Sequence, residues 1–373
     1  MTAWSAQQEL ALKDVRAWYR QPDGPQVFRL FGYAGTGKTT LSREIEAIVR
    51  ESGGDPKKGV MYAAFTGKAA LVMRQKGCNG ARTIHSLIYS LDEESGGVPK
   101  FILNEESDIK DAKLVIIDEC SMVGAELARD LLSFGVKVLV LGDPAQLPPV
   151  QDAGFFTNVT PDVMLTEVHR QARDNPIIRM SMDVREGKRL EHGDFGACKI
   201  IRRGELDPQK ALAADMILVG KNQTRHTCNR RHRELKQFNS PTPATGERLV
   251  CLKNDRTKYL FNGGTWTVEK VRKSNGAAIR MVVAPEDAGD VNRKTEIKVH
   301  PFFFEGREGE LKWEDIRDFQ HFTFGYALTV HKSQGSQWDD VVLLDESAVF
   351  REDARRWLYT GITRAAKTLT VVA

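Results

Sequence analysis

Short apolar runs recur along the first half of the chain and alternate with segments of helical periodicity. The runs at residues 27–31, 60–64, 114–117 and 138–141 predict buried strands. Between and before them, as in residues 5–19, apolar side chains recur at helical spacing. Because strands that alternate with helices form parallel sheets covered by helices, this half predicts an α/β domain.

The pattern changes twice in the second half. A helical segment at 177–187, a buried strand at 216–219 and a basic helix at 222–238 continue the α/β alternation. From about residue 246 to 320 only short strands follow, at 248–252, 266–271, 279–283 and 297–299, with a hairpin turn signal at 262–264. The α/β pattern returns at 324–330, 341–344 and 369–372. We therefore expect a second α/β domain that is interrupted by a small β-barrel-like insertion.

Residues 88–110 form an acidic stretch with two adjacent glycines, Gly96 and Gly97, near its middle. Short alternation on both sides predicts a protruding hairpin. A disordered acidic loop fits the composition equally well, and the sequence leaves both open.

Length and composition set limits on the class of protein. With 373 residues the chain exceeds what one core usually covers. It has no apolar run of membrane-spanning length, and its first residues show no signal-peptide pattern. A membrane partner is therefore not expected. Five scattered cysteines give no disulfide framework, which favours a reducing, cytoplasmic setting. The net charge of +4 permits nucleic-acid binding but does not argue for it.

The stretch from Gly32 to Thr39, GYAGTGKT, is a phosphate-loop motif between a predicted strand and a predicted helix. The motif predicts that backbone N–H groups surround the phosphates of a nucleoside triphosphate, for which Gly35 and Gly37 supply the freedom. Lys38 should reach the β- and γ-phosphates, and the Thr39 hydroxyl should bind Mg²⁺. Thr36 and Thr40 complete the predicted nucleotide-binding set.

Two further strand ends carry acidic or amide groups. Residues 114–117 run into Asp118 and Glu119, which suit Mg²⁺ binding and orientation of the attacking water, respectively. Gln146, in GDPAQLPP, is the candidate that senses the γ-phosphate. Since an arginine can neutralise the charge that develops in phosphoryl transfer, Arg170 and Arg364 are candidates for that role.

Eight motifs occur in a fixed order: GYAGTGKTT, FTGKAA, TIHSL, DECSMV, GDPAQLPPV, LTEVHRQA, TVHKSQGSQWDDVVL and LYTGITRA. Together they resemble the motif set of superfamily 1 DNA helicases, in the 5′-to-3′ branch typified by RecD and the phage helicase Dda. With Gln8, which matches the adenine-recognising glutamine of the family, they extend over residues 8 to 365.

The resemblance implies further roles. Gln146 matches the residue that couples the ATP state to the grip on DNA, and Arg170 and Arg364 match the two arginine fingers. Gly335 matches a glycine that approaches nucleotide and DNA. The positions that line the single-stranded DNA track in the family are Thr66, Lys68, His85, Thr329 and His331.

Phe65 departs from the family pattern, which has proline before the T-G-K motif. An aromatic ring there would stack on a base, worth about 1–3 kcal/mol. Alternatively, Phe65 is an ordinary core residue. The sequence favours the core position.

The implied fold consists of two RecA-like parallel-sheet motor domains of the P-loop NTPase class. The first covers residues 1–87 and 111–175, and the second covers 176–245 and 321–373. Residues 88–110 correspond to a short strand-separating pin, and 246–320 to an SH3-like β insertion.

The resemblance implies an ATP-dependent DNA helicase that uses ATP and Mg²⁺, acts on single-stranded DNA and on junctions with duplex, and works as a monomer. The short acidic pin keeps a second hypothesis open, a translocase or protein-displacing motor with little strand separation. A silent DNA-binding module disagrees with the intact catalytic motifs. Single-strand-binding, replication or recombination proteins are further expected partners, and a bacterial or phage-infected cytoplasm is the expected location.

The basic segment 221–234 is open to two interpretations. Lys221, Arg225, Arg230, Arg231 and Arg233 could form a phosphate-contacting face or a solvated helix face. A metal site is rejected, because no second ligand group with zinc spacing follows the histidines and cysteine of this segment.

Overall fold

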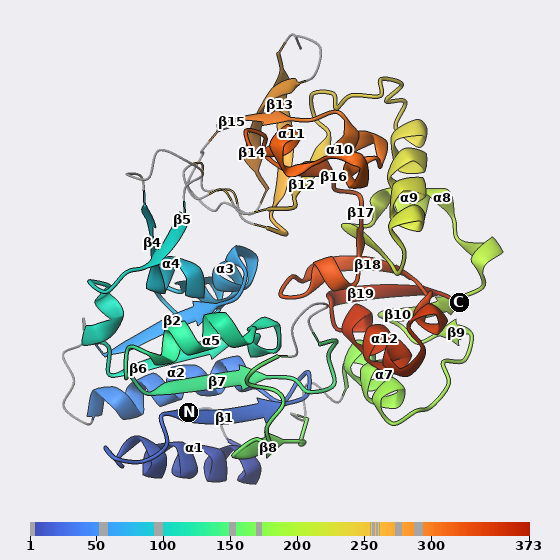
Figure 1. Ribbon diagram of the computed structural model, residues 1–373. Helices are drawn as coiled ribbons and strands as arrows, with labels where there is room; N and C mark the ends of the chain where they lie inside the picture. The colour runs from blue at the N-terminus through green and yellow to red at the C-terminus, as the bar shows by residue number, and fades with distance from the viewer. Residues whose placement is uncertain are drawn as a thin grey trace. The chain divides into compact units, whose positions relative to one another are not determined.

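The computed structural model describes residues 4–51, 59–92, 100–148, 154–168, 174–253, 255, 258, 260, 262–272, 278–286 and 294–373. The chain divides into two compact units, Met1–Arg179 and Met180–Ala373. In Figure 1 the first unit runs from blue to green and the second from yellow-green to red.

The first unit is built on a six-stranded parallel sheet with the order β3-β2-β6-β7-β1-β8. Its strands are β1 (Val27–Gly32), β2 (Val60–Ala64), β3 (Arg82–Thr83), β6 (Leu114–Asp118), β7 (Val138–Gly142) and β8 (Val163–Leu165). Every residue of β7 is buried, which explains why the predicted strands appear as unbroken apolar runs.

Helices cover both faces of this sheet. They are α1 (Ala6–Tyr19), α2 (Lys38–Glu51), α3 (Gly67–Gln75), α4 (Ile84–Ile88) and α5 (Ala125–Leu132), with the short 3₁₀ turns η1 (Asp108–Asp111) and η2 (Cys120–Met122). One core joins α1, α2 and α3 to alternate strand residues such as Leu139 and Leu141. The other joins α4 and α5 to the residues between them, Val138 and Val140. Because strand side chains alternate between faces, both cores derive from the same apolar runs.

The acidic insertion is a two-stranded antiparallel hairpin of β4 (Tyr89–Asp92) and β5 (Lys100–Leu103). The predicted hairpin is therefore confirmed, while its glycines Gly96 and Gly97 lie outside the described residues.

The second unit contains a six-stranded sheet with the order β17-β11-β18-β19-β10-β9, in which only β9 is antiparallel to its neighbour. Its strands are β9 (Gly193–Asp194), β10 (Cys198–Ile201), β11 (Met216–Val219), β17 (Ala327–Thr329), β18 (Trp338–Leu344) and β19 (Ala365–Val372). The accompanying helices are α7 (Pro176–Arg185), which crosses the boundary between the units, α8 (Pro208–Ala213), α9 (Asn222–Leu235) and α12 (Ala354–Ile362), with 3₁₀ turns η3 (Arg203–Glu205), η5 (His331–Ser333) and η6 (Ser347–Asp353). Two α/β domains, as predicted, are thus present.

The insertion is a five-stranded antiparallel sheet with the order β15-β14-β13-β12-β16. It comprises β12 (Arg248–Cys251), β13 (Thr265–Val271), β14 (Ile279–Pro285), β15 (Thr295–Val299) and β16 (Phe322–Phe324), with α10 (Phe302–Glu305), η4 (Glu308–Glu310) and α11 (Trp313–Ile316). The predicted β insertion is confirmed. Its likeness to an SH3 domain and the domain boundaries stay predictions.

The single strand expected at 324–330 is wrong. β16 pairs with β12 of the insertion, whereas β17 pairs with β11 of the α/β sheet. At the break, a Cβ on Gly325 would lie 2.8 Å from the backbone carbon of Leu249, so only glycine fits where the chain passes between the two sheets.

Among the described residues, no helix combines the length and the apolar character that crossing a bilayer requires.

Candidate nucleotide and DNA sites

The segment between β1 and α2 forms a phosphate loop. Gly35 and Gly37 have φ values of +80° and +82°, a region that glycine enters without a Cβ penalty. A Cβ on Gly32 would lie 2.6 Å from Thr36 Oγ1 and 2.9 Å from Leu165 Cβ, so the loop also excludes a side chain there. The three glycines of the motif therefore stand where the loop needs them, with the start of α2 directly behind.

Lys38 lies folded over this loop. Its Nζ donates to the carbonyl oxygens of Gly32 at 2.6 Å and Tyr33 at 3.0 Å. The Thr36 side chain is buried and donates to the same Tyr33 carbonyl at 2.8 Å, whereas Thr40 is exposed. The lysine is thus held beside the loop by contacts that an anion in the loop can replace.

Gln8, on α1, contacts the phosphate loop at Thr36. It is 2% exposed, its Nε2 donates to the Thr36 carbonyl at 3.0 Å, and its Oε1 accepts from Ser5 N–H at 3.0 Å. The neighbouring Gln7 instead accepts from the Thr166 N–H at 2.9 Å. The structure thus places the predicted adenine-recognising amide against the phosphate loop.

Thr39 and the acidic pair meet at the end of β6. Thr39 Oγ1 donates to Asp118 Oδ2 at 3.3 Å, and the other Asp118 oxygen accepts from the Glu119 N–H at 2.9 Å. Burial raises the pKa of the Asp118 carboxyl, Glu119 raises it further, and Lys38 lowers it. Since a hydroxyl and carboxylates are the oxygen ligands that Mg²⁺ prefers, the residues present fit this ion.

Glu119 has a strained backbone. Its φ and ψ are 54° and 45°, the left-handed region, where a residue with a Cβ is disfavoured by about 1–2 kcal/mol. Strain of this kind concentrates at functional sites, and here it falls on the residue that directly follows Asp118.

Gln146 follows β7 and is 9% exposed. In the described part of the chain its Oε1 is buried and has no hydrogen-bond partner. A buried acceptor of this kind costs about 1–3 kcal/mol, so it suits a group that a bound ligand or its water satisfies. Arg170, the first of the two predicted arginines, lies outside the described residues.

Arg364, in the second unit, is buried and exposes only 4% of its surface. Its Nε donates to the Thr360 carbonyl at 3.1 Å, Nη1 to the Ser336 carbonyl at 3.2 Å and Nη2 to Thr363 Oγ1 at 3.2 Å. Ser336 directly follows Gly335, which is buried with φ +72°. The structure thus brings together two motifs that are separated by about thirty residues in the sequence.

The predicted DNA-track residues of the first unit lie around α3 and α4. Thr66 and Lys68 expose only 8% and 7% of their surfaces, and the Thr66 hydroxyl accepts from the Ala69 N–H at 3.1 Å as the cap of α3. Phe65 and His85 are half-buried and meet edge to face, with ring centroids 5.9 Å apart. Phe65 also packs against the core, as its second interpretation predicted.

In the second unit the predicted track residues lie at the end of β17 and in the following turn, η5. The Thr329 side chain is 6% exposed and accepts from the Lys332 N–H at 3.4 Å. His331 is half-buried beside Phe350, with ring centroids 5.1 Å apart. Burial lowers the pKa of His331, and Asp353 opposes this shift.

Two known families match this chain. The AAA domain matches residues 5–202, more than half of the chain, and the UvrD-like helicase C-terminal domain matches residues 324–372. The chain is 28% identical to the ATP-dependent RecD2 DNA helicase of Deinococcus radiodurans, over 92% of this chain and 46% of that protein. It is also 28% identical to the ATP-dependent DNA helicase Pif1 of Bdellovibrio bacteriovorus, over 98% of this chain and 88% of that protein. The chain belongs to the superfamily 1 helicases of the RecD, Pif1 and Dda type.

Solved structures of this helicase type share the fold. The Pif1 helicase from Bacteroides in complex with ADP-AlF3 and ssDNA aligns with a TM-score of 0.58 at 18% identity, over 100% of this chain and 93% of that chain. The chain spans about half the length of the RecD2 relative, so the activity of that whole protein does not transfer directly.

The buried contacts of α9 were not predicted from the sequence. Arg225 and Arg233 are 0% and 8% exposed, so they form neither the phosphate-contacting face nor the solvated face considered above. Arg230 and Arg231 do face solvent. The signal in the sequence is that polar residues occur all round this helix, so it lacks the apolar stripe that a surface helix usually packs on a core.

Proposed function

We propose that this chain is an ATP-dependent DNA helicase that moves along single-stranded DNA in the 5′-to-3′ direction and separates duplex. One observation carries the proposal: in a chain of the RecD, Pif1 and Dda type, Thr39 and Asp118 meet beside the phosphate loop, with Glu119 held next to them. This supports ATP hydrolysis, and the similarity to DNA helicases supports coupling of hydrolysis to DNA.

In this proposal Lys38 binds phosphate oxygens of ATP, and Glu119 orients and polarises the attacking water. Thr39 and Asp118 hold Mg²⁺, which when bound neutralises charge on the phosphates. Gln146 supplies the unpaired acceptor that senses the nucleotide state. Arg170 and Arg364 act as the arginines that stabilise the transition state. The loop residues Gly32, Gly35, Thr36, Gly37 and Thr40, together with Gln8 and Gly335, complete the nucleotide-binding set.

Single-stranded DNA is proposed to contact Phe65, Thr66, Lys68 and His85 in the first unit, and Thr329 and His331 in the second. Since Thr66, Lys68 and Thr329 are almost fully buried, the half-buried rings of Phe65, His85 and His331 offer the most surface for base stacking.

A second candidate function is a translocase that displaces bound proteins and separates few base pairs. It is favoured by the small size of the hairpin, whose two strands contain four residues each. We propose ss/ds junctions as the DNA partner, monomeric action, a cytoplasmic location, and partners among single-strand-binding, replication, repair or recombination proteins.

The experiment compares partial duplexes that carry either a 5′ or a 3′ single-stranded tail, and ATP hydrolysis is measured in parallel. We expect single-stranded DNA to raise ATP hydrolysis strongly and only the 5′-tailed duplex to be separated. Hydrolysis that DNA stimulates without strand separation would establish the translocase instead. If DNA leaves hydrolysis unchanged, the motor function is wrong.

A further inference from the structure

Helix α9 buries a stripe of polar side chains where a surface helix usually buries apolar ones. Arg225, Asn229, His232 and Arg233 expose 0%, 2%, 5% and 8% of their surfaces. Their spacing places them on one face of the helix. Because burying polar groups is costly unless they are hydrogen-bonded, this face needs partners in fixed positions.

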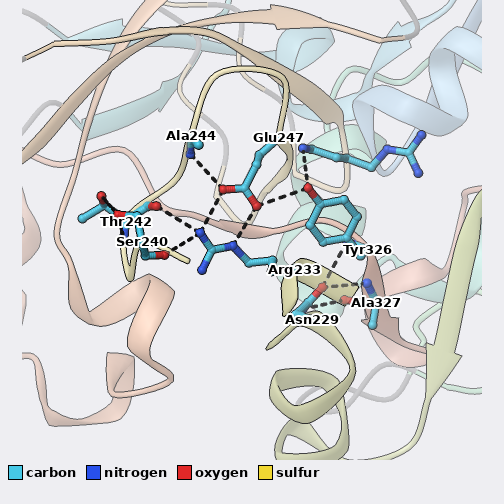
Figure 2. A network of polar contacts seen from close by, with 9 residues as sticks. Asn229, Arg233, Ser240, Thr242, Ala244, Glu247, Tyr326 and Ala327 are labelled. Atoms are coloured by element: carbon cyan, nitrogen blue, oxygen red, sulfur yellow. Dashed lines mark hydrogen bonds and ion pairs between the residues drawn. The ribbon is translucent and has the colours of Figure 1, made fainter. Parts of the chain in front are cut away.

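The partners of Arg233 lie in the segment that leads into the β insertion. Arg233 Nε lies 2.7 Å from Glu247 Oε1, and its Nη2 lies 3.0 Å from Glu247 Oε2. The same Nη2 donates to the carbonyls of Ser240 at 2.6 Å and Thr242 at 3.1 Å, and Ala244 N–H donates to Glu247 Oε2 at 2.8 Å. Glu247 is fully buried, so this is an ion pair inside the protein (Figure 2).

The segment that leaves the insertion is fixed to the same cluster. Asn229 Oδ1 accepts from the N–H groups of Tyr326 at 3.1 Å and Ala327 at 2.9 Å, and its Nδ2 donates to the Ala327 carbonyl at 3.3 Å. The Tyr326 hydroxyl donates to Glu247 Oε1 at 3.2 Å, and its ring stacks on His232 with centroids 4.0 Å apart. Figure 2 shows the hydrogen bonds of Asn229, Tyr326 and Glu247 converging between α9 and the two connecting segments.

α9 also contacts the insertion at a third place. The buried Arg225 donates through Nη2 to Glu308 Oε1 at 2.9 Å, in η4. The Arg233 guanidinium lies 4.1 Å from the centre of the Phe324 ring, in β16. One helix thus holds the entry, the exit and an interior element of the insertion.

The exit segment continues directly into the predicted DNA track. Ala327 begins β17, which ends at Thr329, and His331 follows in η5. A bidentate ion pair has a fixed geometry, whereas apolar surfaces permit small sliding movements. The contacts of Arg233 and Asn229 thus connect α9 and β17 to both ends of the insertion through groups of defined geometry.

We propose that Arg233 and Tyr326 are positioning residues for strand separation, which hold the β insertion and the strand leading to Thr329 as one rigid body. This inference rests on the proposed helicase function. In this proposal the β insertion moves with the second motor domain against the duplex. Loss of the contacts that hold the insertion should therefore lower the number of base pairs separated per ATP without stopping ATP hydrolysis.

The test measures three quantities on the full chain: ATP hydrolysis without DNA, hydrolysis with an oligo-dT strand, and base pairs separated per ATP on a 5′-tailed fork. In Arg233→Met we expect both hydrolysis rates within about 2-fold of wild type and a fall of at least 10-fold in base pairs per ATP. Tyr326→Phe, which removes one hydroxyl, should lower that yield about 3-fold. Arg231→Met is the matched control on the exposed side of α9 and should change nothing.

The double variant Arg233→Met/Glu247→Leu separates positioning from mere stability. It leaves no unpaired buried charge, so thermal stability should recover toward wild type. A positioning role requires that the yield per ATP stays low in this variant, and recovery of the yield along with stability would overturn the inference. If Arg233→Met does not fold, Tyr326→Phe and the double variant decide. Failure of the proposed function is seen separately, in the wild-type protein: if it does not separate strands at all, the proposed helicase function is wrong.

Discussion

The side-chain amide of Gln8 donates to the backbone carbonyl of Thr36 at 3.0 Å, which fastens helix α1 to the phosphate loop. The other end of the amide caps the first turn of its own helix through Ser5. Gln8 therefore contacts the phosphate loop directly, whereas the family resemblance implied only that it recognises the adenine base.

We predict that Gln8→Ala weakens the binding of all nucleoside triphosphates alike. The Thr36 carbonyl in the phosphate loop loses its hydrogen-bond donor, and this loss does not depend on which base the nucleotide carries. The half-saturating concentrations of ATP and GTP should both rise, by about 5- to 30-fold, as expected for loss of about 1–2 kcal/mol. Gln7→Ala, one residue earlier, should leave both unchanged. A rise for ATP alone would point to adenine recognition.

Lys38→Ala should abolish ATP hydrolysis. The Lys38 ammonium is held within reach of the loop by the Gly32 and Tyr33 carbonyls, and loss of such a charge at a developing anion costs at least about 100-fold in rate. Steady-state hydrolysis with single-stranded DNA is the measurement, with the exposed Lys13→Ala as the control. Hydrolysis at the wild-type rate would refute the catalytic site.

Glu119→Gly should make the protein more stable and inactive at the same time. Glycine relieves the left-handed backbone at φ 54°, a gain of about 1 kcal/mol, but removes the carboxylate that orients water. Gln237 also has a positive φ, 61°, so Gln237→Gly should give a similar rise in melting temperature with full activity. An active Glu119→Gly protein would contradict the assignment of Glu119.

Arg233→Met should lower the free energy of unfolding by about 3–5 kcal/mol, because it leaves the Glu247 carboxylate buried without its partner. Chemical denaturation measures this. Arg231→Met, which breaks the exposed pair with Glu234, should cost less than about 0.5 kcal/mol. Equal losses in the two variants would mean that the Arg233 pair is not buried as described.

His232 makes stability depend on pH. Burial, with Lys236 and Arg248 nearby, lowers the pKa of His232 to about 4 from 6.5. Between about pH 6.5 and 4 the His232 imidazole binds a proton in the unfolded chain but stays neutral in the folded chain. The free energy of unfolding should therefore fall as pH drops from about 6.5 toward 4. His232→Gln should show a shallower fall over this range in thermal unfolding. An identical slope in both proteins would show that His232 is not the group responsible.

Local pattern determined much of this protein. The unbroken apolar runs specified the strands of the first sheet, since strands buried on both faces need apolar side chains throughout. The glycines of the phosphate loop, Lys38, Thr39 and the Asp118–Glu119 pair were predicted because each stands at a sequence spacing that its chemistry requires. Spacing of this kind is a local property, which a sequence displays directly.

Contacts between distant segments were decided by the tertiary structure alone. The apolar pattern at 324–330 was continuous, yet Gly325 passes the chain from one sheet to another because its neighbours leave no room for a Cβ. Likewise, the composition of α9 could not distinguish a solvated or DNA-binding arginine from one paired inside the protein. That choice depended on Glu247 and Glu308, which lie 14 and 83 residues away from Arg233 and Arg225, respectively, and which only the folded chain brings to them.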